Sequence, residues 1–332
     1  MRRHKLAAPA VRGTNSQWVT LPALALLVSA CGGSSSQTSD QTLPVYLSVP
    51  ERGEQLSIGP FDVPSGTEVQ ICRTLKMSNT EAVGVNRLQV SLAQGSHHFI
   101  LFRSNKDFPD EVFPCWGTVN FDDWEFMIDV NKSGGEDWQL ADGQAFVLQP
   151  NQQIMIQSHF VNATTVQSPK GGMALVNMFE VDPNVAHPLH GMFTVDTRIN
   201  IPPHSAYTTS RACTFDQTVY LAAMTGHFHA RGLEFSVNRF RDNVLMPEQI
   251  YDSKSWDSPN FEIFPQPSDV FNTFDDGVEF TCSYFNNTDN TIGWGGHADV
   301  QEHCNLFFQY YFYNESDPKN KPMTCKEGSG GW

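Results

Sequence analysis

The stretch QIMIQSHFV, residues 153–161, indicates a β-strand with a histidine on one of its faces. Alternate residues of a strand share a face, so Ile154, Ile156 and Phe160 lie together on the more apolar side. His159 lies on the opposite side. It therefore fits a site residue better than a core residue.

Similar strand-like segments recur along the chain, each bounded by Gly, Pro, Asn or Asp. They are residues 69–74, 87–92, 99–103, 173–179, 219–225, 233–237 and 306–312. With 24 glycines and 20 prolines the chain is rich in turn residues, and hydrophobic residues (40%) are numerous enough for a core. This pattern predicts an all-β fold. The acidic, turn-rich stretch 133–143 is expected to be a surface loop.

The length of 332 residues exceeds the usual size of a single domain. The sequence VDPN at residues 181–184 breaks the strand pattern near the middle and is our predicted boundary. We therefore expect two domains, an N-terminal one over 44–184 and a C-terminal one over 185–332.

The N-terminus has the pattern of a targeting segment. A basic start is followed by an apolar run over 21–28, which is too short to span a membrane. VSAC at residues 28–31 resembles a bacterial lipobox, which predicts a signal peptide over 1–30 and lipidation of Cys31. A plain secretory signal with an incidental cysteine is the alternative. The Ser- and Gly-rich stretch within 31–43 predicts a flexible tether.

These features predict an extracytoplasmic protein anchored by lipid to a bacterial membrane, on the periplasmic or outer-membrane face. One acyl chain binds only marginally, so stable anchoring requires several chains on the cysteine. Loss of residues 1–30 removes four basic side chains and changes the formal net charge from −15 to −19. Such a charge disfavours binding to nucleic acid and to anionic lipid.

Six cysteines remain after Cys31. They are Cys72, Cys115, Cys213, Cys282, Cys304 and Cys325. An even number in an exported chain predicts three disulfides, and six cysteines allow fifteen pairings. The sequence contains no CxxC pair, which disfavours a thiolate zinc site or a thioredoxin-like motif.

Two groups of histidines, one in each half of the chain, are the main functional signal. The first group is His97, His98 and His159, and the second is His227, His229 and His303. Neutral imidazole is the commonest protein ligand for copper and zinc, so two separate metal centres are predicted. The competing interpretation, that these histidines only pack or hydrogen-bond, predicts no stoichiometric metal.

Strand geometry supports ligation by these groups. His227 and His229 are two residues apart, so a strand would project both rings to one side. His303 and Cys304 would take opposite faces of one strand. The adjacent pair His97-His98 would diverge on a regular strand, so joint ligation requires a bend or bulge at Gly95-Ser96.

Four motifs in order give this chain a resemblance to the type II, ascorbate-dependent copper monooxygenases, a family that includes the peptidylglycine hydroxylating and dopamine β-hydroxylating enzymes. The motifs are HHFILF (97–102), QSH (157–159), HFH (227–229) and EHCNL (302–306). The resemblance covers roughly residues 60–326. It implies two antiparallel, jelly-roll-like β-sandwich domains that face each other across a cleft, each with its own copper. It also implies the disulfides Cys72–Cys115, Cys213–Cys325 and Cys282–Cys304.

The resemblance further assigns roles to the histidines. His97, His98 and His159 match the ligands of the electron-donating copper, with Gln157 beside them. His227 and His229 match two ligands of the copper that binds oxygen. Its third ligand in the family is a methionine, and here that position is His303. A third imidazole is harder than a thioether and favours Cu(II), and three imidazoles are also a catalytic zinc set.

Other departures concern the substrate. The family arginine that binds a peptide carboxylate is replaced by Thr225, and the tyrosine that assists it by Phe307, whereas Asn305 is kept. Without the arginine the bidentate clamp is lost, which disfavours peptide amidation. Thr225, Phe307, Asn305 and Met224 are the candidate pocket residues.

We therefore predict a copper-dependent monooxygenase with two copper ions per chain. It would hydroxylate an aliphatic C–H bond of a small organic substrate with O2 and an external reductant such as ascorbate, and His227, His229 and His303 would form its catalytic centre. One alternative is a non-catalytic periplasmic lipoprotein that binds or delivers copper. Another is a zinc hydrolase at the same three histidines, although no glutamate adjoins the HFH motif to act as a base.

Overall fold

The structure is a computed structural model. It describes residues 45–116, 120, 123–131, 134–165, 168–242, 244–266 and 268–326. The predicted signal peptide (1–30), Cys31 and the tether (31–43) lie outside these residues. The described residues belong to one compact unit. Among the described residues, no helix is long and apolar enough to cross a membrane.

The predicted all-β class is confirmed, since every regular element of the described residues is a strand. Each of the eight segments predicted as strands lies within an observed strand. The expected loop over 133–143 is partly wrong, because it contains β7 (Gly135–Gln139). Trp138 in β7 is only 5% exposed, and burial of this large ring stabilises pairing with the neighbouring strand.

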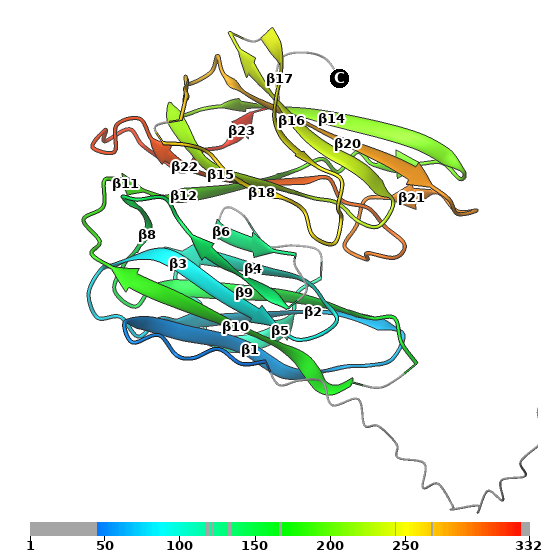
Figure 1. Ribbon diagram of the computed structural model, residues 1–332, viewed down its shortest axis with the longest axis horizontal. Helices are drawn as coiled ribbons and strands as arrows, with labels where there is room; N and C mark the ends of the chain where they lie inside the picture. The colour runs from blue at the N-terminus through cyan, green and yellow to red at the C-terminus, as the bar shows by residue number, and fades with distance from the viewer. Residues whose placement is uncertain are drawn as a thin grey trace, which may run out of the picture. The chain divides into compact units, whose positions relative to one another are not determined.

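Two sheets are built from the first part of the chain (Figure 1). The first has the order β1 (Gly53–Val63), β10 (Ser168–Val181), β3 (Val83–Leu92), β8 (Gln144–Leu148), β11 (His187–Pro188), with β7 also on β3. The second has the order β5 (Glu111–Pro114), β2 (Thr67–Lys76), β9 (Gln153–Asn162), β4 (Ser96–Ser104), β6 (Glu125–Val130). All pairs are antiparallel except β11 with β8.

Three sheets are built from the second part. One has the order β12 (His190–Val195), β22 (Asn305–Phe312), β15 (Val219–His227), β18 (Phe261–Ile263), with β19 (Val270–Phe271) also on β15. Another has the order β17 (Val244–Ser253), β16 (Gly232–Arg241), β20 (Gly277–Asn286), β14 (Ser205–Phe215), β23 (Cys325–Lys326). The third pairs β13 (Asn200–Ile201) with β21 (Ile292–Gly293).

Two large apolar clusters lie mainly in the two parts, and the first also takes in Ala222 and Tyr311 of the second part. The first core contains Ile154 and Ile156, the residues predicted for the apolar face of β9. The second is rich in aromatic rings, including Phe235 and Phe280. Strands of the first two sheets pair with strands of the other three nowhere among the described residues. The division at residue 184 and the cleft between two domains stay predictions.

Three disulfides close the fold. They join Cys72 to Cys115, Cys213 to Cys325 and Cys282 to Cys304. These are the pairs that the resemblance implied. The third bond fixes the segment that carries His303 to β20, because Cys304 follows His303 directly.

Candidate metal centre

The His97-His98 pair shows the predicted irregularity. Gly95 has a φ of +86°, a conformation that glycine adopts without strain, and it immediately precedes β4. The register between β4 and β9 shifts between Ser96 and His98. The bulge brings the two adjacent rings to a centroid distance of 5.2 Å rather than to opposite faces.

His227 ends β15, so the strand geometry predicted for the HFH motif holds only for its first histidine. His229 is instead held by Glu302, a fully buried residue whose Oε2 accepts from the His229 backbone N–H at 2.9 Å. The Arg231 N–H donates to the other carboxylate oxygen, Oε1, at 2.9 Å. Likewise β22 begins only at Asn305, so His303 lies in the preceding loop.

The structure brings all six predicted histidines into one cluster. The His97 ring centroid lies 5.0 Å from that of His159, 5.2 Å from His227 and 5.3 Å from His229. His98 lies 5.0 Å from His159 and 5.6 Å from His227. His303 lies 4.4 Å from His229 and 5.7 Å from His227.

Two trios within this cluster have metal-binding spacing. In His97, His98 and His159, and again in His97, His227 and His229, one ligand atom from each residue lies within 4.8 Å of the other two. The first trio is the predicted N-terminal set. The second contains His97 from β4 where His303 was predicted, so the two trios share a residue.

The environment keeps five of the six rings neutral. Burial lowers the pKa of His97, His98, His227 and His303 well below the usual value, and neighbouring imidazoles lower it further. Burial lowers the pKa of His229 to about 4. At neutral pH these five imidazoles therefore carry lone pairs that are available to a metal.

Buried nitrogens without partners show that the residues fit a metal. Seven imidazole nitrogens have no hydrogen-bond partner among the described residues: His97 Nε2, His98 Nε2, His159 Nδ1, His227 Nδ1 and Nε2, His229 Nε2 and His303 Nδ1. Buried polar atoms are normally paired, and an unpaired one costs about 1–3 kcal/mol. A shared set of metal ions would satisfy these atoms together.

Outer contacts define which nitrogen of two rings faces inward. His229 Nδ1 donates to the Gln301 carbonyl at 2.9 Å, and His159 Nε2 donates to Glu68 Oε2 at 3.0 Å. The opposite nitrogens, His229 Nε2 and His159 Nδ1, are the unpartnered ones. Such a carboxylate–histidine–metal arrangement fixes the ring tautomer and raises ligand basicity.

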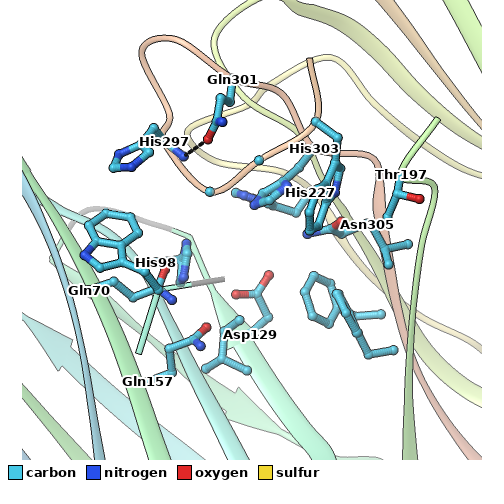
Figure 2. A pocket seen from close by; sticks show the side chains of 18 of the residues that line it. Gln70, His98, Asp129, Gln157, Thr197, His227, His297, Gln301, His303 and Asn305 are labelled. Atoms are coloured by element: carbon cyan, nitrogen blue, oxygen red, sulfur yellow. Dashed lines mark hydrogen bonds between the residues drawn. The ribbon is translucent and has the colours of Figure 1, made fainter. Parts of the chain in front are cut away.

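A cavity of about 600 Å³ adjoins the cluster. Figure 2 shows His98, Gln157 and Asp129 on one side of it and His227, His303 and Asn305 on the other. The predicted residues Gln157, Asn305 and Phe307 line this cavity. Thr225 lines a different, smaller cavity, and its Oγ1 donates to the Asn260 carbonyl at 3.0 Å. Met224 is fully buried in the second core.

Sequence reasoning missed Asp129 and Glu68. Asp129 is 3% exposed and lines both cavities, and burial raises its pKa to about 7. Its Oδ2 accepts from Asn131 Nδ2 at 2.5 Å, whereas Oδ1 has no partner among the described residues. The signal in the sequence was a lone acid inside the apolar run of β6. Glu68 gave no comparable signal.

Comparison with known families identifies the second part of the chain. The family model for the copper type II ascorbate-dependent monooxygenase, C-terminal domain, matches residues 189–330. Residues 189–330 thus match the C-terminal domain of this copper monooxygenase family. The match includes His227, His229 and His303. No curated protein sequence matches the chain.

Solved structures add little to this assignment. Among 33 matching chains is the crystal structure of PBCV-1 VP54 fitted into a cryo-EM reconstruction of the virophage Sputnik. It has a TM-score of 0.32 and 10% identity, over 80% of this chain and 95% of that chain. This likeness carries no argument about function.

Proposed function

We propose that the chain is a copper-dependent monooxygenase that hydroxylates an aliphatic C–H bond of a small organic substrate. The observation that carries this proposal is the set of seven unpartnered imidazole nitrogens beside a cavity of about 600 Å³. The copper- and ascorbate-dependent family matched by residues 189–330 supports copper over zinc.

All six histidines would hold the copper, His97, His98 and His159 on one side of the cluster and His227, His229 and His303 on the other. Copper held there would supply oxygen binding and one-electron transfer. Overall, O2, two electrons from a reductant such as ascorbate and two protons convert R–H into R–OH and water. Glu68 and the Gln301 carbonyl orient the rings of His159 and His229.

The cavity indicates which substrates it could accept. Phe102, Phe193 and Phe307 give it apolar walls, and none of the described lining residues is a lysine or an arginine. Asp129 Oδ1 and Asn305 Oδ1 are buried acceptors without a partner among the described residues. We therefore propose a small, largely apolar substrate with a hydrogen-bond donor, and not a carboxylate.

The test is oxygen uptake by the copper-loaded protein with ascorbate and a panel of small organic compounds. The proposal expects ascorbate-dependent uptake with a hydroxylated product that contains one atom from ¹⁸O₂. Copper loading with no product from any member of a broad panel would instead favour the non-catalytic copper protein. A His303→Met variant, which restores the family ligand, tests whether the third imidazole limits oxygen chemistry.

We further propose that Cys31 anchors the protein to a bacterial membrane from the extracytoplasmic side. The support is the VSAC sequence at residues 28–31. Metabolic labelling with a fatty acid would detect the lipid. A Cys31→Ala variant is expected to lose both the label and membrane association, and a labelled variant would contradict the proposal.

A further inference from the structure

A second, smaller cavity of about 220 Å³ is lined by residues from both parts of the chain. Its walls come from β6, β7 and Asn131 of the first part, and from β15 and residues 258–261 of the second. Trp138 of β7 stacks there on Phe261 of β18, with 3.7 Å between ring centroids. No histidine lines this cavity among the described residues, and Asp129 is the residue that it shares with the larger cavity.

Three buried polar atoms in these walls have no hydrogen-bond partner among the described residues. They are Asp129 Oδ1, Asn131 Oδ1 and Trp138 Nε1. All three residues are buried, with exposed fractions of 3%, 6% and 5%. Asn131 uses its Nδ2 to donate to Asp129 Oδ2, so its amide oxygen is left for another partner. Because buried polar atoms are normally paired, these atoms indicate a polar ligand in the cavity.

The charge of the walls favours a cation as that ligand. Asp129 and Glu136 are acidic, and none of the described lining residues is a lysine or an arginine. Burial, together with the nearby charge of Glu136, raises the pKa of Asp129 to about 7. A bound cation would offset this effect and hold both carboxylates ionised. Water alone would pair the three atoms but would leave the two acidic groups without a counter-charge.

The donor set favours a hard cation over copper. Asp129, Asn131 and Glu136 offer side-chain oxygens, and the described walls contain no histidine, cysteine or methionine. Thr225 Oγ1 donates its hydrogen to the Asn260 carbonyl at 3.0 Å, which leaves its own lone pairs for an ion or a water.

Calcium fits this set best, because Ca²⁺ takes six to eight oxygen ligands in irregular geometry and accepts waters among them. The N–H of Trp138 is a donor, so it would pair with a water held on the ion. A hydrated calcium ion therefore satisfies all three unpartnered atoms.

We propose that Asp129, Asn131 and Glu136 form a calcium site, separate from the histidine cluster, in which the ion keeps several waters. The site joins the two parts of the chain through Thr225. A carboxylate oxygen has two lone pairs, so calcium on Asp129 leaves one for a donor in the larger cavity. The inference does not depend on the proposed function.

The test is titration of the copper-free full chain with Tb³⁺, which replaces Ca²⁺ at oxygen sites and emits when a nearby excited tryptophan transfers energy to it. We expect one tightly bound Tb³⁺ per chain with tryptophan-sensitised emission, because Trp138 lines the cavity. Ca²⁺ should displace it with a Kd on the order of 10⁻⁴ M, since two carboxylates are a low ligand charge. No sensitised emission, or emission that Ca²⁺ does not displace, would overturn the proposal.

Variants show whether the ion lies in this cavity. Asp129→Asn and Glu136→Gln are each expected to weaken Ca²⁺ binding about tenfold or more, because each removes a charged ligand. Asp142→Asn, an exposed change, is the matched control and should bind as the wild type does. Glu136 is only half-buried, so Glu136→Gln decides the question if Asp129→Asn fails to fold. Unchanged binding in Glu136→Gln and in any folded Asp129→Asn would place the ion elsewhere and overturn the site.

Trp138→Phe separates binding from emission. This variant keeps an aromatic ring against Phe261 but transfers far less energy to Tb³⁺. It is expected to lose most of the sensitised emission while calorimetry still detects Ca²⁺ binding. Full emission in Trp138→Phe would mean that another tryptophan is the donor and would contradict the proposed site.

Discussion

Glu68 orients the ring of His159 by a direct hydrogen bond. Its Oε2 accepts from His159 Nε2, which leaves Nδ1 of that ring for the metal. Loss of such a carboxylate partner typically weakens metal binding 10–100-fold. We expect Glu68→Gln to lower copper affinity by about this factor, as measured by competition with a chelator. Glu51→Gln, an exposed change, is the control, and equal affinity in both variants would contradict the role.

Asp129 allows a prediction about pH. Burial raises its pKa in the folded protein to about 7, whereas in the unfolded chain an aspartate ionises near 3.9. Between about pH 4 and 7 the unfolded chain releases a proton that the folded protein retains. The contribution of Asp129 to stability therefore falls as the pH rises through this window.

Asp129→Asn removes this loss, because an amide does not ionise. The variant is expected to gain stability relative to the wild type between pH 5 and pH 8, by up to a few kcal/mol. Thermal unfolding of both metal-free proteins at the two pH values measures the difference. If the difference in stability between the wild type and the variant is the same at both pH values, Asp129 is already ionised in the folded state.

At the scale of elements, the bulge before β4 can be tested through Gly95. A side chain at its φ of +86° is strained, and an added Cβ would lie 3.2 Å from the Val161 carbonyl oxygen. Gly95→Ala is expected to cost about 1–2 kcal/mol of stability and also to weaken copper binding by displacing His97 and His98.

The control is Gly66→Ala, because Gly66 has a φ of +67° and open space around its Cβ position. It shares the backbone strain but lies outside the histidine cluster. Chemical unfolding and copper titration of both variants are the measurements. Equal loss of copper affinity in the two variants would mean that affinity only follows stability.

The sequence could predict those features of the fold and the site that depend on the residue pattern within a single strand. Period-2 alternation placed Ile154 and Ile156 in a core and identified the bulge that His97-His98 requires. The same alternation was wrongly applied to His229 and His303. These residues lie outside the strands, because β15 ends at His227 and β22 begins only at Asn305. Residues whose partners come from distant elements left no local pattern, as with Glu302, which binds the backbone of residues 229 and 231.

Across the whole molecule, the sequence singled out the six histidines that the structure brings together, but not that the two groups would meet in one cluster. His97 and His227 are separated by 130 positions, and their rings lie 5.2 Å apart because strands of the two parts pack together, as in the contact of Gln309 of β22 with Met127 of β6. Metal bound there would join the two parts of the chain. It would therefore stabilise both together, as a ligand that binds only the folded state does.

Copper loading is accordingly expected to raise the temperature of one shared unfolding transition. At a free copper concentration 100 times Kd the gain is about 2.7 kcal/mol per site. Differential scanning calorimetry with copper, and again after addition of a chelator, measures the shift. The double variant His97→Ala and His227→Ala, which removes a ring from each part, should show almost no shift. If copper instead splits the transition, raising one component and leaving the other unchanged, the metal is held by one part of the chain alone.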